Sequence, residues 1–440
     1  MDQEVELLAP AGGIAAFHAA VRGGADAVYL GLQSFNARRG ADNFTIDTFA
    51  DACAFAHLRG VNVYVTLNTA ILPGEVDSAM ETARQAYRAG ADAFIVQDIG
   101  IASELSRTLP QARLHISTQM NTHNEAGMRA AAQLGAARVT LARELSLPEI
   151  EHLAKVGDQL GLEIETFAHG ALCVCYSGQC FMSSLIGGRS ANRGLCAQAC
   201  RLPYALHNVA KSKPLPAPGD HLLSPQDLCS IDLLPDLVRA GVASLKIEGR
   251  MKSPEYVYAV TSAYRAALDR VLVARDAARE SGAQDWAAPG GTEQEHAQLA
   301  EAFSRGFTTA YLEGKRGNEI MSYGRPNNRG VFVGRVASVK NGKAAVACER
   351  PIVAGDVLEF WTNKGHFAYT VSQVDADRNG NLLLAPERAV GKGDRVFRVR
   401  SAEAAFVDDD RLPRIQVQGR ARLRIGQPLR IEFCLADNPA

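Results

Sequence analysis

The chain has 440 residues, of which 47% are hydrophobic, so it is long enough for two or three domains with packed cores. Its 47 Lys and Arg residues nearly balance its 48 Asp and Glu residues, and a net charge of −1 excludes a global positive field as the means of binding nucleic acid. Because the sequence has neither an apolar run long enough to span a membrane nor the pattern of a secretory signal, we expect a cytoplasmic protein with reduced cysteines.

Short apolar segments alternate with amphipathic helical stretches from residue 5 to about residue 270, which is the pattern of repeated βα units. Helical stretches reach the next strand through a glycine, as at Gly24, Gly90 and Gly135. This pattern predicts a (β/α)8 barrel of the TIM type, whose active site forms where the strands end. The eight expected strands are Val5–Leu8, Ala27–Leu30, Asn62–Thr66, Ala93–Val96, Leu114–Ser117, Arg138–Leu141, Glu163–Phe167 and Ser244–Ile247.

Polar side chains follow the predicted strands and should meet at one mouth of the barrel. Arg143 and Arg250, with His169 as a third group that can carry a positive charge, would suit a carboxylate or phosphate ligand. Glu248 has the alternative of a structural ion pair with one of these groups. The candidates are Asn68, Gln119, Arg143 and Arg250 for substrate binding, and His169 and Glu248 for catalysis.

Six of the nine cysteines lie in one glycine-rich stretch that begins just after the seventh predicted strand, at Cys173, Cys175, Cys180, Cys196, Cys200 and Cys229. Clustered thiolates suit zinc or an iron–sulfur cluster. The spacings lack the paired C-x2-C motifs of zinc ribbons and the C-x2-C-x2-C run of bacterial ferredoxins. An irregularly ligated iron–sulfur cluster is therefore favoured over structural zinc, with disulfides third.

Alternating strands with tight turns begin at residue 330 and predict a small antiparallel β-barrel. New alternating strands start at residue 415, and two or three lone strands cannot bury a core. They therefore either add to another sheet or belong to a further domain of which the chain holds only the start. The expected domains are 1–272, a barrel with a cluster-binding insertion at 170–230; 273–329, a helical excursion and linker; 330–405, the small β-barrel; and 406–440, the start of a truncated β domain.

Several motifs resemble the signature of the collagenase-like peptidase family U32. They are Leu8-Ala-Pro-Ala-Gly12, Asn192-Arg-Gly-Leu-Cys196, Ser244-Leu-Lys-Ile-Glu-Gly-Arg250 and the segment from Glu165 to Ser183, which contains His-Gly-Ala-Leu-Cys-Val-Cys-Tyr-Ser-Gly-Gln-Cys. The resemblance covers about residues 3 to 400. The stretch from Met182 to Tyr204 is most similar to the branch that hydroxylates a cytidine of 23S rRNA with prephenate. The tail resembles the start of an additional domain in longer members.

This resemblance implies an RNA-modifying enzyme with a 4Fe–4S cluster and prephenate as co-substrate, acting on rRNA or tRNA, and it leaves a protein partner open. Cys173, Cys180 and Cys196 match the ligands that most cluster-binding members share. The fourth ligand is either Cys229 or Cys200. We favour Cys229, because it precedes the eighth strand and would close the site from the opposite side of the mouth.

The family name implies a different chemistry, a metal- or cysteine-dependent collagenase-like peptidase. The sequence contains neither an H-E-x-x-H helix nor a G-x-S-x-G elbow, which argues against common peptidase machinery. Cys175 or Cys180 beside His169 would imitate a Cys–His pair, but such a pair leaves the other thiols unexplained. A non-catalytic, cluster-bearing subunit of a hydroxylation complex is the third alternative.

Overall fold

The computed structural model describes residues 5–211, 213–283, 286–340, 342–402, 406, 417–424 and 426–435. The chain divides into two units, Met1–Phe406 and Val407–Ala440. Among the described residues, no helix is both long and apolar enough to cross a membrane.

Eight parallel strands form a closed barrel in the first unit. Each strand pairs with the next in chain order, and the last, β11, pairs with both β7 and β1. The predicted fold class is therefore confirmed. The strands are β1 (Glu6–Pro10), β2 (Ala27–Leu30), β3 (Asn62–Leu67), β4 (Ala93–Val96), β5 (Arg113–Ile116), β6 (Arg138–Thr140), β7 (Glu163–Ala171) and β11 (Ser244–Ile247).

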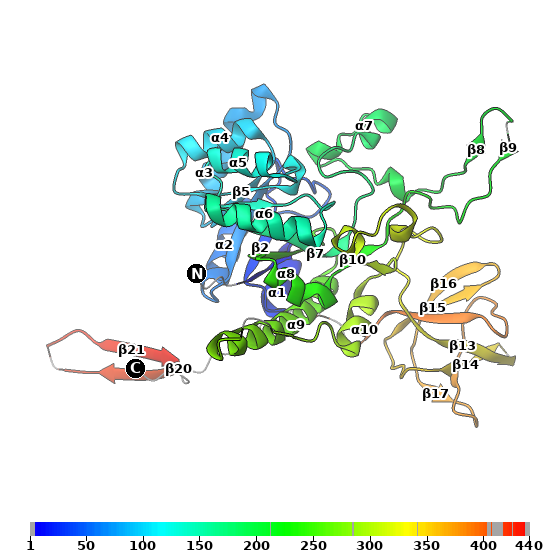
Figure 1. Cartoon of the computed structure of the whole chain (residues 1–440). Coiled ribbons are helices and arrows are strands. Elements are labelled where there is room, and N and C mark those ends of the chain that lie inside the picture. Colours follow the sequence, from blue (N-terminus) through cyan, green and yellow to red (C-terminus); the bar gives the residue numbers. More distant parts are fainter. Residues whose placement is uncertain are drawn as a thin grey trace. The chain divides into compact units, whose positions relative to one another are not determined.

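Helices follow the strands and cover the outside of the barrel, as the blue and cyan part of Figure 1 shows. Their apolar faces and the outer faces of the strands form one continuous hydrophobic core. The helices are α1 (Ile14–Arg22), α2 (Ile46–His57), α3 (Val76–Arg88), α4 (Ile99–Thr108), α5 (Glu125–Gln133), α6 (Leu147–Leu160), α8 (Leu234–Arg239) and α9 (Pro254–Glu280).

The cysteine-rich insertion lies between β7 and β11. It contains α7 (Met182–Gly187), three short 3-10 turns, the two-residue strands β8 (His207–Asn208) and β9 (Lys213–Pro214), and β10 (Asp227–Cys229). β10 runs antiparallel to the far end of β7, with Cys229 opposite His169, and β12 (Phe307–Thr308) pairs with β10. The seventh barrel strand thereby carries a small extension beyond the barrel.

A seven-stranded antiparallel sheet with its own hydrophobic core follows the barrel. Its strands are β13 (Val331–Lys340), β14 (Lys343–Cys348), β15 (Val357–Thr362), β16 (Gly365–Thr370), β17 (Asp375–Ala376), β18 (Leu382–Leu384) and β19 (Arg395–Arg400). The expected domain boundary at residue 272 falls inside α9, which continues to Glu280, and the predicted short helix is α10 (Glu293–Ala302).

The described residues of the second unit form one antiparallel hairpin, β20 (Val417–Arg422) with β21 (Arg430–Leu435). Alternating strands were expected in this part of the chain.

Candidate active site at the barrel mouth

The cysteine-rich segment is anchored to the barrel mouth at Ser177, which is fully buried between two of the cysteines. Its backbone N and its Oγ donate to Glu144 Oε1, over 2.9 and 3.2 Å. Arg143 Nε donates to Ser177 Oγ over 3.1 Å. Arg143 and Glu144 follow β6, so the predicted strand-end residue Arg143 and its neighbour hold the cysteine segment in place.

A second anchor lies across the mouth, on the loop that follows β3. Ala70 N donates to Asn192 O over 2.9 Å, and Arg193 forms an ion pair of 2.7 Å with Glu75. Gly178 and Gly194 adopt positive φ angles of 71° and 78°. A Cβ at either position would overlap a backbone carbonyl of another mouth loop, so glycine permits the close approach. The cysteine segment therefore spans the mouth.

The thiols of this segment are close enough to influence one another. Burial raises the pKa of Cys200, and the charges of Cys173, Cys196 and Cys180 raise it further, against the opposing effect of Arg201. Burial and the charges of Cys180 and Cys173 raise the pKa of Cys175 to about 11. None of the cysteines whose side chains are described forms a disulfide. Five thiols of one segment thus gather above the mouth.

Cys229 lies apart from that group. It is 7% exposed, belongs to the barrel core, and accepts a hydrogen bond of 3.9 Å from the Tyr264 hydroxyl. Burial raises the pKa of Cys229 to about 11, and the other groups that influence it are Ile231, Tyr264, Asp232 and Asp227 rather than thiols. Cys200, unlike Cys229, is therefore an electrostatic neighbour of Cys173, Cys180 and Cys196. The expected choice of Cys229 as fourth ligand, with Cys200 as the alternative, stays a prediction.

The soft thiol donors match the chemistry of an iron–sulfur cluster, since such clusters bind several deprotonated sulfurs. Within the described part of the chain, however, no three Cys, His, Asp or Glu side chains are already arranged to hold a metal ion. The donor set fits a cluster by its chemistry, and the thiols would have to come closer together to bind one.

Arg250 occupies the mouth as a buried cation, with 3% of its surface exposed. Its Nη1 donates to Thr66 Oγ1 over 3.0 Å. Its Nη2 donates to the side-chain oxygens of Asn36 and Asn43, over 3.0 and 2.7 Å. All three acceptors are uncharged. Burial lowers the pKa of Arg250 to about 10, which still leaves the group positive near neutral pH.

Glu248 is largely buried in the same mouth, with 18% of its side chain exposed, and pairs with Arg38 over 3.1 Å. Burial alone would raise the pKa of Glu248, but Arg38, then Arg250 and Arg143, lower it below its ordinary value. The structural ion pair considered for Glu248 therefore exists, but with a cation that sequence reasoning missed. The guanidinium groups of Arg38, Arg143 and Arg250 act on Glu248, and Glu144 is a second carboxylate at the mouth, so three cations exceed two carboxylates and suit an anion.

The missed residues Asn36, Arg38 and Asn43 all come from the loop between β2 and α2. Its signal in the sequence was a polar stretch, with two arginines between two asparagines, directly after a predicted barrel strand.

His169 was expected to be able to carry a positive charge, and its surroundings in the structure disfavour this. It is 1% exposed, its two ring nitrogens have no hydrogen-bond partner among the described residues, and its ring packs on Tyr264 and Phe307 at 5.4 and 5.6 Å. Burial, with a smaller effect of Lys252, lowers the pKa of His169 to about 3. The ring is neutral near pH 7 and adds no positive charge to the mouth.

The two amide candidates have structural contacts. Asn68 Oδ1 accepts a hydrogen bond of 3.0 Å from the backbone N of Ala37, which supports the loop that carries Arg38. The backbone of Gln119 is the surface on which Gly178 of the cysteine segment rests. Their assignment to substrate binding stays a prediction, as do the assignments of Arg143 and Arg250.

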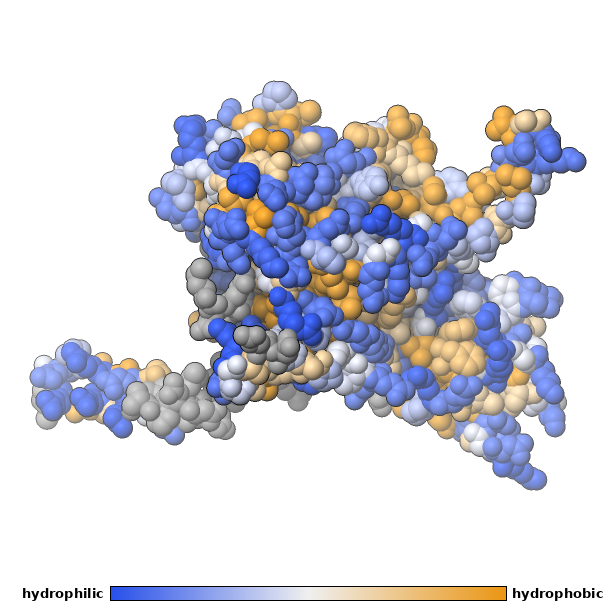
Figure 2. Space-filling model, in the orientation of Figure 1, coloured by the Kyte–Doolittle hydropathy of each residue, from blue (hydrophilic) through white to orange (hydrophobic). Residues whose placement is uncertain are grey.

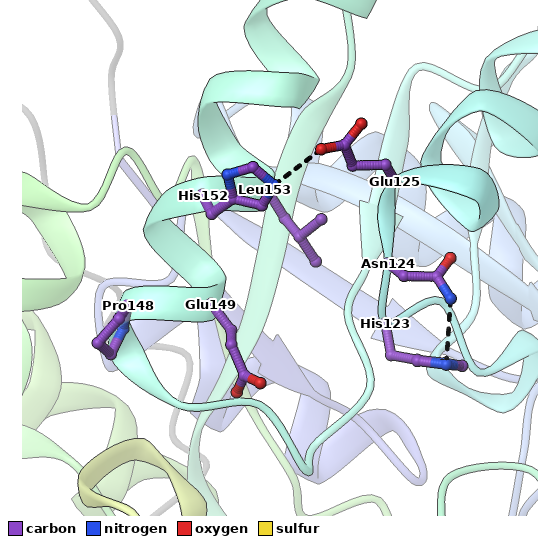
Figure 3. A pocket seen from close by; sticks show the side chains of 7 residues that line it. All are labelled: His123, Asn124, Glu125, Pro148, Glu149, His152 and Leu153. Atoms are coloured by element: carbon purple, nitrogen blue, oxygen red, sulfur yellow. Dashed lines mark hydrogen bonds and ion pairs between the residues drawn. The ribbon is translucent and has the colours of Figure 1, made fainter.

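A separate pocket of about 360 Å³ lies beside the first turns of α5 and α6. Figure 3 shows two pairs among its polar side chains. His152 Nε2 lies 2.9 Å from Glu125 Oε1, and Asn124 Nδ2 lies 3.3 Å from His123 Nε2. Glu149 accepts hydrogen bonds from the N-cap residue Ser146. The pocket therefore lacks convergent free donors.

The cysteine segment exposes large apolar side chains. Tyr176 and Phe181, which flank the first cysteines, are 68% and 59% exposed, and Leu185 of α7 is 85% exposed. Figure 2 shows hydrophobic surface over α7 and over the β8–β9 hairpin. Exposed apolar groups of this size beside a site are typical of surfaces that contact a ligand or partner.

The chain matches the model of peptidase family U32 over residues 12–322, and it belongs to this family. Curated relatives span most of the chain. It is 39% identical over 389 residues to a 23S rRNA 5-hydroxycytidine synthase of Escherichia coli strain K12, which covers 87% of this chain and 56% of that protein. The chain thus spans little more than half of that relative.

Two further relatives carry different names. The chain is 33% identical to tRNA hydroxylation protein P1 of Bacillus subtilis strain 168, over 86% of this chain and 89% of that protein. It is 34% identical to a protein named collagenase of Porphyromonas gingivalis, over 76% of this chain and 80% of that protein. Among solved structures, the U32 peptidase Mk0906 matches 38% of this chain and 70% of its own, with 13% identity and a TM-score of 0.32.

Proposed function

We propose that this chain is an RNA-modifying enzyme that hydroxylates a nucleoside of rRNA or tRNA without molecular oxygen, with a 4Fe–4S cluster and a prephenate-type anionic donor. The observation that carries the proposal is that the thiols of the cysteine segment and the guanidinium groups lie at the same mouth of the barrel. The names of the Escherichia coli and Bacillus subtilis relatives, which refer to rRNA and tRNA hydroxylation, supply the substrate class.

Cys173, Cys180, Cys196 and Cys200 would hold the cluster, because these four thiols are electrostatic neighbours on one segment. Cys229 is the alternative fourth ligand. A bound cluster supplies one-electron chemistry that amino-acid side chains lack.

The anionic donor would bind to the excess positive charge of the mouth. Arg250 and Arg143 would hold its carboxylates, since Arg38 is already paired with Glu248. Glu248, ionised by its neighbours, is the candidate that can accept a proton. His169 is neutral and buried among aromatic rings, which suits a structural role.

The RNA would approach the exposed side of the cysteine segment. The rings of Tyr176 and Phe181 are accessible there, and exposed aromatic rings stack on unpaired bases. A doubly substituted Tyr176→Ala, Phe181→Ala variant should therefore retain iron but lose RNA modification. A matched change of the exposed Val273 on α9 to Ala should leave modification intact.

A collagenase-like peptidase is the second candidate, and the name of the Porphyromonas gingivalis relative supports it. A Cys–His pair finds no support in the geometry. His169 has no hydrogen-bond partner among the described residues, and the raised pKa of Cys175, about 11, disfavours a reactive thiolate. The third candidate is a non-catalytic subunit that carries the cluster.

Three measurements on matched strains separate these candidates. Deletion of the gene should remove the mass of one oxygen atom from one nucleoside of rRNA or tRNA. A Cys180→Ala copy should fail to restore that mass, whereas Cys53→Ala, in the barrel core on α2, should restore it. Anaerobically purified protein should contain roughly four irons. Unchanged RNA masses together with Cys180-dependent cleavage of casein would establish the peptidase instead.

A further inference from the structure

Lys252 has an unusual position for a lysine, just after the last barrel strand. Its Nζ lies 2.8 Å from the ring centroid of Phe303 and 5.4 Å from that of Tyr256. Among the described residues its amine has neither a hydrogen bond nor an ion pair. The lysine inside the barrel, Lys246, contrasts with it, because Lys246 pairs with Glu165 over 2.7 Å. The amine of Lys252 therefore packs on aromatic rings and has no carboxylate partner among the described residues.

The charged groups around Lys252 disfavour its protonated form. Burial lowers the pKa of Lys252 to about 7, and Arg305 and Arg201 lower it against the opposing effects of Asp227 and Glu248. Asp227 is itself paired with Arg305 over 2.6 Å. His169 is neutral, and burial holds the pKa of Tyr256 well above its ordinary value, so neither adds a compensating charge. A large fraction of the amine is therefore unprotonated near neutral pH.

Arg305 lies beside this amine and would suit an acid group, because its guanidinium carbon is 4.6 Å from the centroid of the same Phe303 ring. Arg305 donates from Nε to Pro326 O and from Nη1 to Asp227, and its Nη2 donates no hydrogen bond among the described residues. Arg201 is already committed, since its Nη1 donates to Ser224 Oγ and Pro225 O and its Nη2 donates to Leu172 O. The free donor beside the amine is therefore Nη2 of Arg305.

We propose that Lys252 is a nucleophilic amine that forms an imine with the carbonyl carbon of a small oxo acid, whose carboxylate is held by Arg305. The Nζ atom bonds to the carbonyl carbon, the carbon–oxygen bond breaks, and the oxygen leaves as water with the two amine protons. No oxidant or reductant is required. The inference depends neither on the cluster nor on RNA, so it stands or fails separately from the proposed function.

The test uses the purified full chain at pH 7, with pyruvate as the probe and cyanoborohydride to reduce any imine to a stable secondary amine. Peptide mass spectrometry should find the adduct on Lys252, with at least ~10-fold less on Lys155, which is 67% exposed and ion-paired with Glu151. The reason is that an ordinary lysine, with a pKa near 10.4, is unprotonated in only about one molecule in 10³ at this pH.

Two controls make the result decisive. Lys252→Met retains the chain length and the aromatic contact, so it should fold with an unchanged melting temperature and lose the adduct peptide. Adduct formation on Lys252 should rise with pH through a midpoint near 7. An adduct that is absent from Lys252, or equally abundant on Lys155, would overturn the proposal and leave Lys252 as a structural cover for Phe303.

Discussion

The two ends of the barrel interior differ in how their most buried cations are paired. At the end where the strands begin, Arg138 pairs with Glu6 over 2.5 Å and with Glu163 over 2.7 Å, and Lys246 pairs with Glu165 over 2.7 Å. Both of these buried cations contact carboxylates. At the mouth, Arg250 contacts only uncharged oxygens.

This difference indicates that the end where the strands begin is structural and that the mouth is a binding site. Buried ion pairs cancel charge locally and create little field beyond themselves. Arg250 and Arg143 instead leave positive charge facing the place where the cysteine segment crosses the mouth. Substitutions at the closed end should therefore change stability, whereas substitutions at the mouth should change what the protein binds.

The largest effect at the mouth should come from the thiols. Cys200→Ala should abolish the iron chromophore of anaerobically purified protein, because Cys200 is an electrostatic neighbour of Cys173, Cys180 and Cys196. Cys229→Ala is the matched control and should keep the chromophore, since Cys229 lies in the barrel core. Absorption spectra and iron analysis measure both. Loss of iron only in the Cys229 variant would restore the original assignment of the fourth ligand.

At the closed end, Glu165→Ala should lower the free energy of unfolding by about 3 to 5 kcal/mol, because it leaves buried Lys246 without a carboxylate and removes one of the carboxylates around Arg138. Urea denaturation at pH 7 measures this. Glu151→Ala removes an exposed partner of Lys155 and should cost much less, because solvent screens this pair. Similar losses in the two variants would refute the view of the closed end as a buried charge network.

The sequence predicted the barrel well because its strands have a local signature. β2, β4 and β11 match their predicted bounds, since a short apolar run between turns defines each of them. β10 and β12 were not predicted. Strands of two or three residues carry no periodicity, and these two exist because the end of β7 offers unpaired backbone groups.

The site was predictable where residues directly follow a strand. Arg143 and Arg250 were expected at the mouth and lie there, because parallel strands end at one edge. Arg38 was missed, since a sequence does not indicate which side chain of a long loop turns inward. His169 was wrongly expected to be able to carry charge, because the rings of Tyr264 and Phe307 that bury it come from distant segments.

Arg250→Gln should weaken binding of prephenate by about 2 to 5 kcal/mol, because it removes a buried cation that would grip a carboxylate. Isothermal calorimetry measures the loss. Arg113→Gln, which removes an exposed arginine paired with Glu163, should leave the affinity unchanged. If Arg250→Gln binds prephenate as tightly as the unaltered protein while its melting temperature falls, Arg250 only supports Asn36, Asn43 and Thr66.

The smallest expected effect concerns His169 and acid. Its pKa in the folded protein is about 3, against about 6.5 in an unfolded chain, so below pH 6.5 the unfolded state binds a proton that the folded state cannot. The stability due to this group is complete above pH 6.5 and is lost as pH falls toward 3. Between pH 7 and pH 5 the protein should lose about 2 kcal/mol more than a His169→Phe variant, in which an aromatic ring still packs on Tyr264. Urea denaturation at the two pH values measures the difference.

His152→Gln, at an exposed histidine, should retain the full pH dependence. Equal pH dependence in the unaltered protein and in His169→Phe would mean that the ring of His169 is solvated or has a hydrogen-bond partner. His169 would then be able to carry a positive charge at the mouth.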